Sequence, residues 1–97
     1  MLFRSNVSIE IEVDDLDQYK EALTCNPTLI LLDNFTVEEC KKAIEIRNQR
    51  AINTLLESSG GITFEIVKEY AKTTVDYIAV GSLTHSSPAL DIGLDFI

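Results

Sequence analysis

The sequence predicts an α/β fold built from four βα-type units with parallel strands. Three observations predict it. Four short apolar segments recur along the 97 residues, and amphipathic helical patterns separate them. The segments end at or next to Glu12, Asp33, Glu57 and Gly81, which are 21, 24 and 24 residues apart, about one βα unit each time. Strands that alternate with helices in this way form parallel sheets with right-handed crossovers.

The predicted strands are short and differ in pattern. They are SIEIEV (8–13), TLILLD (28–33), NTLLES (53–58) and DYIAVGS (76–82). The first alternates, with Ile9, Ile11 and Val13 on one face and Glu10 and Glu12 on the other. The second and fourth are nearly continuous apolar runs, which is typical of parallel strands with both faces buried. We therefore expect both faces of these two strands to be covered.

Three helical stripes lie between the strands. They are Leu16, Tyr19 and Leu23; Val37, Cys40, Ala43 and Ile44; and Phe64, Val67, Tyr70 and Ala71. The first helix is expected to end before the second strand, because Pro27 cannot continue a helix. Thr36, followed three residues later by Glu39, predicts a capping box at the start of the second helix. Thr63 is the candidate N-cap of the third helix.

Composition indicates one domain over residues 1–97 and excludes several classes of function. The apolar fraction of 45% is that of a globular chain, and no window approaches the roughly 18 apolar residues of a membrane span. The start, MLFRSNVSIE, is too short and polar for a secretory signal, so a cytoplasmic location is expected. Sixteen acidic and eight basic residues give a net charge of −8, which repels nucleic acids and anionic membranes.

The two cysteines and the one histidine form no metal or redox motif. Cys25 falls in a predicted loop, and Cys40 lies on the apolar stripe of the second helix. Their spacing does not exclude a disulfide, whereas a zinc site requires more ligands at closer spacing. His85 lacks the Ser or Asp partners of a catalytic triad. It either donates to a phosphate or lies exposed at the start of a short helix.

Two loops of small residues follow the last two strands, Ser59-Gly60-Gly61 and Gly81-Ser82. In a βα barrel the active site lies at the carboxyl ends of the strands, and phosphate often binds at the loops after the last two. Backbone N–H groups at a helix N-terminus hold phosphate, and glycine lets that backbone approach closely. The alternative is a βα turn that needs glycine only for its positive φ. Two such loops one unit apart favour a phosphate site.

Glu12 and Asp33 lie at the ends of adjacent predicted strands. One interpretation is that their carboxylates face each other and hold ribose hydroxyls or a hydrated Mg²⁺. The alternative is that both are solvated acids at strand ends. Asp33 follows four apolar residues, so its carboxylate lies where a buried strand opens.

Together these segments resemble a known family. The matching pieces are IEIEVDDLDQ, LILLDNF, LLESSGGIT, VDYIAVGSLTHS and ALDIGLDFI. In order and spacing they resemble the C-terminal part of quinolinate phosphoribosyltransferase, also called nicotinate-nucleotide pyrophosphorylase (carboxylating). The resemblance implies half of a TIM-like α/β barrel.

The resemblance also implies a reaction and a set of site residues. The family condenses quinolinate with phosphoribosyl pyrophosphate to give nicotinate mononucleotide, pyrophosphate and CO₂, a glycosyltransferase step in NAD biosynthesis that uses Mg²⁺. By this resemblance Glu12 and Asp33 contact the ribose and the Mg²⁺-pyrophosphate, directly or through water. The residues implied to hold phosphate are Ser59, Gly60, Gly61, Gly81 and His85.

The family's chain is longer than these 97 residues. Its N-terminal sandwich domain and its first barrel strands, with the basic cluster that binds quinolinate, have no counterpart here. We therefore expect the 97-residue chain alone to be inactive. Half a barrel exposes two strand edges, so a homo-oligomer is also expected. The alternatives are a non-catalytic phosphate- or nucleotide-binding half-barrel that acts by self-association or with a complementing chain, and a folding module whose sites are idle.

Overall fold

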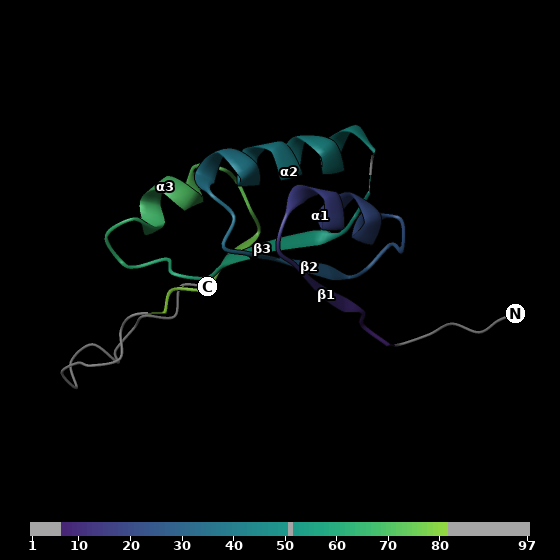
Figure 1. Cartoon of the computed structure of the whole chain (residues 1–97), viewed down its shortest axis with the longest axis horizontal. Coiled ribbons are helices and arrows are strands. Elements are labelled where there is room, and N and C mark those ends of the chain that lie inside the picture. The colour runs from purple at the N-terminus through teal and green to yellow at the C-terminus, as the bar shows by residue number, and fades with distance from the viewer. Residues whose placement is uncertain (1–6, 51, 82–97) are drawn as a thin grey trace, which may run out of the picture.

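The computed structural model describes residues 7–50 and 52–81, which form a sheet covered by helices on one face (Figure 1). The strands are β1 (Glu10–Val13), β2 (Leu29–Asp33), β3 (Leu55–Ser59) and β4 (Tyr77–Ile78). The helices are α1 (Leu16–Leu23), α2 (Val37–Gln49) and α3 (Val67–Ala71). The sheet has the order β1-β2-β3-β4, and every neighbouring pair is parallel. The predicted α/β fold with parallel strands is confirmed.

The strand boundaries differ from the prediction mainly at the end of the sheet. β3 extends to Ser59 because that residue pairs with Asp33 of β2. β4 contains two residues, whereas the pattern predicted a strand over 76–82. Beyond it, the Ala79 N–H still donates to the Ser58 carbonyl at 2.9 Å. The backbone contact with β3 therefore continues one residue beyond the end of the two-residue strand.

The core lies between the sheet and the helices. Most helix-facing side chains of the strands are buried, namely Val13, Ile30, Leu32, Leu56 and Ser58, while Ile11 and Ile78 on the same face are half-buried. On the opposite face, which we call the open face, lie Glu10, Glu12, Leu29, Leu31, Asp33, Leu55, Glu57, Ser59 and Tyr77. The expectation that both faces of the second and fourth strands are buried is wrong for the described residues. Leu29 and Leu31 are only half-buried, and Tyr77 is 40% exposed, because all three helices lie on the other face.

The first two helices form as their sequences predict. The stripe of α1 is confirmed by the burial of Tyr19 and Leu23, and that of α2 by the burial of Cys40 and Ile44. At the start of α2, the Glu39 N–H donates to Thr36 Oγ1 at 3.1 Å, and the Thr36 N–H donates to Glu39 Oε1 at 2.9 Å. This is the predicted capping box, which satisfies two backbone donors that the helix leaves free.

The third helix is shorter than predicted and begins later. Its N-cap is Ile66, without a side-chain cap, so the prediction of Thr63 as N-cap is wrong. Residues 64–66 form a turn in which the Ile66 N–H donates to the Thr63 carbonyl at 3.1 Å. Phe64 is 55% exposed and belongs to no buried stripe. The described sheet gives α3 only two residues of β4 to pack on, so tertiary contacts do not extend it.

Both cysteines are free, so the disulfide that their spacing left open does not form. Cys25 is exposed in the loop after α1. Cys40 is buried, and its Sγ lies 3.1 Å from Ser58 Oγ. Burial raises the pKa of the Cys40 thiol, so it remains protonated and unreactive.

Two tyrosine hydroxyls tie the helices to backbone carbonyls. Tyr19 of α1 donates to the Ala43 carbonyl of α2 at 2.6 Å, and Tyr70 of α3 donates to the Phe35 carbonyl at 2.9 Å. Tyr19 is fully buried, and burial raises the pKa of its phenol to about 12.

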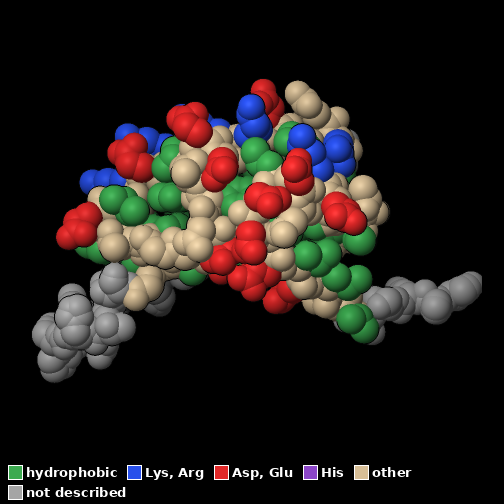
Figure 2. Space-filling view, in the orientation of Figure 1, with side chains coloured by type: hydrophobic (Ala, Val, Ile, Leu, Met, Phe, Trp, Pro, Cys, Tyr) green, Lys and Arg blue, Asp and Glu red, His purple; other side chains and the backbone are tan. Residues whose placement is uncertain are grey.

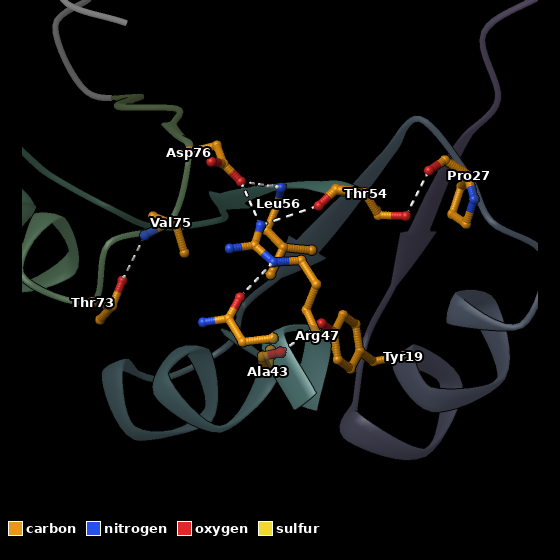
Figure 3. Close-up of polar contacts among 10 residues, drawn as sticks. Tyr19, Pro27, Ala43, Arg47, Thr54, Leu56, Thr73, Val75 and Asp76 are labelled. Atoms are coloured by element: carbon orange, nitrogen blue, oxygen red, sulfur yellow. Dashed lines mark hydrogen bonds and ion pairs between the residues drawn. The ribbon is translucent and has the colours of Figure 1, made fainter. Parts of the chain in front are cut away.

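An ion pair joins α2 to the amino ends of β3 and β4 (Figure 3). Arg47 Nη1 lies 2.8 Å from Asp76 Oδ2 and 3.1 Å from the Thr54 carbonyl, to both of which it donates. The same Asp76 oxygen accepts the Leu56 N–H at 2.9 Å. The two charged side chains are only 14% and 29% exposed. We call these contacts the Arg47 clamp.

Figure 2 shows a group of acidic side chains on the side of the molecule away from the helices. Basic side chains lie on the helical side in this view. No helix within residues 7–50 and 52–81 is long and apolar enough to cross a membrane.

The raised pKa of Tyr19 predicts a loss of stability at alkaline pH. The folded protein retains the phenol proton between pH 10 and 12, where the unfolded chain has lost it. The contribution of Tyr19 to stability is therefore intact below pH 10 and falls by about 2–3 kcal/mol as pH rises to 12. Tyr19→Phe is expected to remove this fall and, because a buried hydrogen bond is lost, to cost about 1 kcal/mol at pH 7. Urea unfolding at several pH values measures both effects. Tyr77→Phe, at an exposed position, is the control, and an identical alkaline fall in Tyr19→Phe would contradict the assignment.

The Arg47 clamp predicts unequal costs for two charge deletions. Arg47→Met leaves the Thr54 carbonyl and the Asp76 carboxylate without their cation and is expected to cost about 1–3 kcal/mol of unfolding free energy. Lys41→Met removes an exposed pair with Glu38, with side chains 55% and 82% exposed, and should cost less than about 1 kcal/mol. Chemical denaturation compares the two variants. Equal costs would show that the clamp contributes no more than a surface pair.

Candidate functional site

The register of the sheet brings the predicted acids to one edge. Asp33, the last residue of β2, pairs with Ser59, the last residue of β3. Glu12 of β1 pairs with Leu31, two residues before Asp33 on the same face. Glu12 and Asp33 are therefore diagonal neighbours on adjacent strands, with Cα atoms roughly 8 Å apart. They share the open face, but they do not stand directly opposite each other.

Gly60 lies against the end of β2. Its φ of 92° is in the region that favours glycine. A Cβ added there would lie 2.8 Å from Asp33 Oδ1 and 2.6 Å from Asn34 Oδ1. It would also lie 2.9 Å from the Asn34 backbone nitrogen. The backbone of the Ser59-Gly60-Gly61 loop therefore approaches the Asp33 carboxylate more closely than any other residue type allows.

Gly61 continues the loop with a φ of 68°, and a Cβ added there would meet nothing within 4 Å. The loop does not open directly into a helix, because residues 62–66 separate it from α3. A phosphate at this loop would therefore meet loop amides rather than the first turn of a helix. Such amides form anion-binding concavities when successive N–H groups converge.

Gly81 lies beside the same loop. Its N–H donates to the Ile62 carbonyl at 3.2 Å, so this amide already has a partner. The contact holds the segment after β4 against the loop after β3. The structure thus brings together Asp33, Ser59, Gly60 and Gly61, with Gly81 attached through its backbone. Ser82 and His85 lie outside the described residues.

The donor set suits a hard cation that also binds phosphate. Within the described part of the chain, no group of three or more Asp, Glu, His or Cys side chains is placed to hold a metal. Mg²⁺ characteristically binds one or two carboxylates and completes its shell with water and substrate phosphates. Glu12 and Asp33, on one exposed face beside a glycine loop, fit that pattern. A complete all-protein metal cage is not required.

Sequence reasoning missed Asn34. This residue has a φ of 61°, and its N–H donates to the Ser59 carbonyl at 2.9 Å. The signal was an Asn between the last strand residue and a buried aromatic, Phe35, because Asn tolerates positive φ where a chain must turn.

Comparison with known proteins places these residues in a family context. Residues 2–95 match the family model described as quinolinate phosphoribosyl transferase, C-terminal domain. A nicotinate-nucleotide pyrophosphorylase (carboxylating) of Mycobacterium leprae is 55% identical over 86 residues, which are 89% of this chain and 30% of that protein. A probable nicotinate-nucleotide pyrophosphorylase (carboxylating) of Methanocaldococcus jannaschii is 40% identical over 102 residues, 97% of this chain and 36% of that protein.

Solved structures that resemble this chain carry the same enzyme name as the relatives found by sequence. The nicotinate-nucleotide pyrophosphorylase of Ehrlichia chaffeensis superposes with a TM-score of 0.71 at 42% identity, over 79% of this chain and 27% of that one. That of Francisella tularensis gives 0.71 at 37% identity, over 81% and 27%. The chain thus spans about a third of the length of the proteins it matches.

The surroundings of the two glycines predict different costs for adding one methyl group. Gly61→Ala meets open space and pays only the strain of positive φ, about 1–2 kcal/mol of unfolding free energy. Gly60→Ala adds a collision with Asn34 and Asp33 and is expected to cost about 3 kcal/mol or more. Urea unfolding of the two variants provides the comparison. A Gly60→Ala cost no larger than that of Gly61→Ala would show that the loop moves away from β2 freely.

Proposed function

The chain belongs to the quinolinate phosphoribosyl transferase family, and we propose that it provides the phosphate- and ribose-binding half of such an enzyme's barrel. The reaction would join quinolinate and phosphoribosyl pyrophosphate to give nicotinate mononucleotide, pyrophosphate and CO₂. The observation that carries the proposal is the contact of the Gly60 backbone with the end of β2 at Asp33. It places a carboxylate and a glycine loop at one edge of a parallel sheet, where barrel enzymes bind substrate phosphates.

In this proposal the loop and the acids have separate tasks. The loop of Ser59, Gly60 and Gly61 offers backbone N–H groups to a phosphate, and glycine allows the close approach. The carboxylates of Glu12 and Asp33 accept hydrogen bonds from ribose hydroxyls. They also stabilise positive charge that develops on the ribose ring as pyrophosphate departs. When bound, Mg²⁺ would neutralise pyrophosphate oxygens, and Glu12 and Asp33 are the residues that would hold it.

Recognition of quinolinate requires groups that these strands do not supply. Quinolinate carries two carboxylates, and phosphoribosyl pyrophosphate adds further negative charge. Among the described strand residues, the open face carries Glu10, Glu12, Asp33 and Glu57 and no Lys or Arg. We therefore propose that catalysis needs basic side chains from elsewhere, and that the 97 residues alone bind product without forming it.

A second candidate function is association with a complementing chain. The open face mixes half-buried leucines with four acids, so it suits a partner surface that is apolar and basic. A second copy, the occupant that the sequence analysis expects, would place like charges against each other if it docked on this face. Light scattering tests the self-association arm: a mass of two chains would support a second copy as the occupant, and a mass of one chain would exclude it. A cytoplasmic location stays a prediction from the sequence.

The proposal predicts binding that backbone amides report. On addition of nicotinate mononucleotide and Mg²⁺ to the ¹⁵N-labelled chain, we expect the amides of Gly60 and Gly61 to shift while that of Gly93 does not. Asp33→Asn is expected to weaken binding about tenfold, equivalent to about 1.4 kcal/mol, because a charge and a proposed Mg²⁺ ligand are lost.

Glu38→Gln, at an exposed position on α2, is the matched control and should bind as the wild type does. Unmoved glycine amides at saturating ligand would contradict the phosphate site. Formation of nicotinate mononucleotide by the purified chain, measured by chromatography, would contradict the need for basic residues from elsewhere.

A further inference from the structure

Asn34 lies between the two parts of the proposed site, the Asp33 carboxylate at the end of β2 and the Ser59-Gly60-Gly61 loop after β3. Its N–H donates to the Ser59 carbonyl at 2.9 Å, which links the ends of β2 and β3 beyond their last paired residues. The residue after it, Phe35, is buried with 2% of its surface exposed. The chain therefore turns sharply at Asn34, from an exposed sheet edge into the core.

The side chain of Asn34 does more than permit this turn. A Cβ at Gly60 would lie 2.6 Å from Asn34 Oδ1, closer than it would lie to Asp33 Oδ1 at 2.8 Å. The Gly60 backbone thus rests against two side chains that come from consecutive residues. At the next residue of the loop the surroundings are open, because a Cβ at Gly61 would meet nothing within 4 Å.

We propose that Asn34 is a positioning residue: its side chain holds the Gly60 backbone beside Asp33 and so fixes the spacing between the carboxylate and the glycine loop. The inference rests on the proposed function, since the spacing matters for binding only if one ligand contacts both. Asn34 itself need not touch that ligand. Its amide is neutral, so it supports an anion-binding loop without adding to the charge of Glu12 and Asp33.

The bland explanation of Asn34 is its backbone alone, because Asn adopts positive φ more readily than most residues. The chain contains a matched control for this explanation. Asn26 has a φ of 52°, is also exposed, and lies at the other end of β2, where its N–H donates to the Leu23 carbonyl at 3.1 Å. Changing either Asn to Gly preserves the positive φ and removes only the side chain.

The experiment compares Asn34→Gly with Asn26→Gly in the ¹⁵N-labelled chain. Without ligand, we expect the backbone order parameters of Gly60 and Gly61 to fall in Asn34→Gly and to stay unchanged in Asn26→Gly. With nicotinate mononucleotide and Mg²⁺, the dissociation constant should rise fivefold to tenfold in Asn34→Gly only. The urea midpoints of the two variants should agree, because both retain the backbone conformation.

A third variant tests the contact itself. Asn34→Asp keeps the size and the tolerance of positive φ, so it should restore the order of Gly60 and Gly61. It should not restore affinity, because a carboxylate is added beside a bound anion. Recovery of affinity without recovery of order would overturn the positioning role.

Two further outcomes separate the inference from the proposed function. Unchanged order parameters in Asn34→Gly, or equal losses of affinity in Asn34→Gly and Asn26→Gly, would overturn the role of Asn34. Absence of binding by the wild type, with loop order lost only in Asn34→Gly, would overturn the proposed function and support the positioning role.

Discussion

The structure depends on one constraint: a parallel sheet whose helices all lie on the same face. Side chains alternate along each strand, so covering one face fixes which residues enter the core and which remain outside. Val13, Ile30, Leu32 and Leu56 fill the covered side. The intervening residues, acids among them, are left on the open face. A shift of one residue in β1, β2 or β3 would exchange the two sets and bury carboxylates without partners, so burial and register enforce each other.

The sequence predicted most of this arrangement because its signals were local and strong. Alternation in 8–13 identified the buried face of β1, and the Thr36–Glu39 capping box located the start of α2 to the residue. The errors occur where tertiary surroundings decide. A continuous apolar run such as LILL in β2 indicates apolar neighbours, but it does not say whether both faces meet them within these residues. The late start of α3 has the same cause, since the short β4 gives that helix little to pack against.

The candidate site was predictable to the level of strand ends but not to the level of contacts. Counting residues between apolar segments placed Asp33 and the Ser59-Gly60-Gly61 loop at one edge, and the register confirms that placement. Counting could not show that Glu12 pairs with Leu31, two residues before Asp33, because the register between two strands is set by packing. Nor could it show that the Gly81 N–H is bonded to Ile62, or that Asn34 supports Gly60. Those contacts depend on backbone angles of single loop residues. The ligand-binding roles of these residues remain predictions.

The amino ends of the strands contribute stability to the fold, and the carboxyl ends carry the proposed ligand-binding groups. This separation explains how the protein can keep groups at the proposed site that stabilise the fold little. At the amino ends the Arg47 clamp joins α2, β3 and the start of β4 through shielded charges and three hydrogen bonds. At the carboxyl ends, Gly60 and Gly61 both have positive φ, and the Gly60 backbone lies against the Asp33 carboxylate. Carboxylates and strained loop residues are poor sources of stability, yet they are the groups that a phosphate, a ribose and a divalent cation require. Because the Arg47 clamp stabilises the fold at the amino ends of the strands, the carboxyl ends can carry residues that add to the stability of the protein only when a ligand is bound.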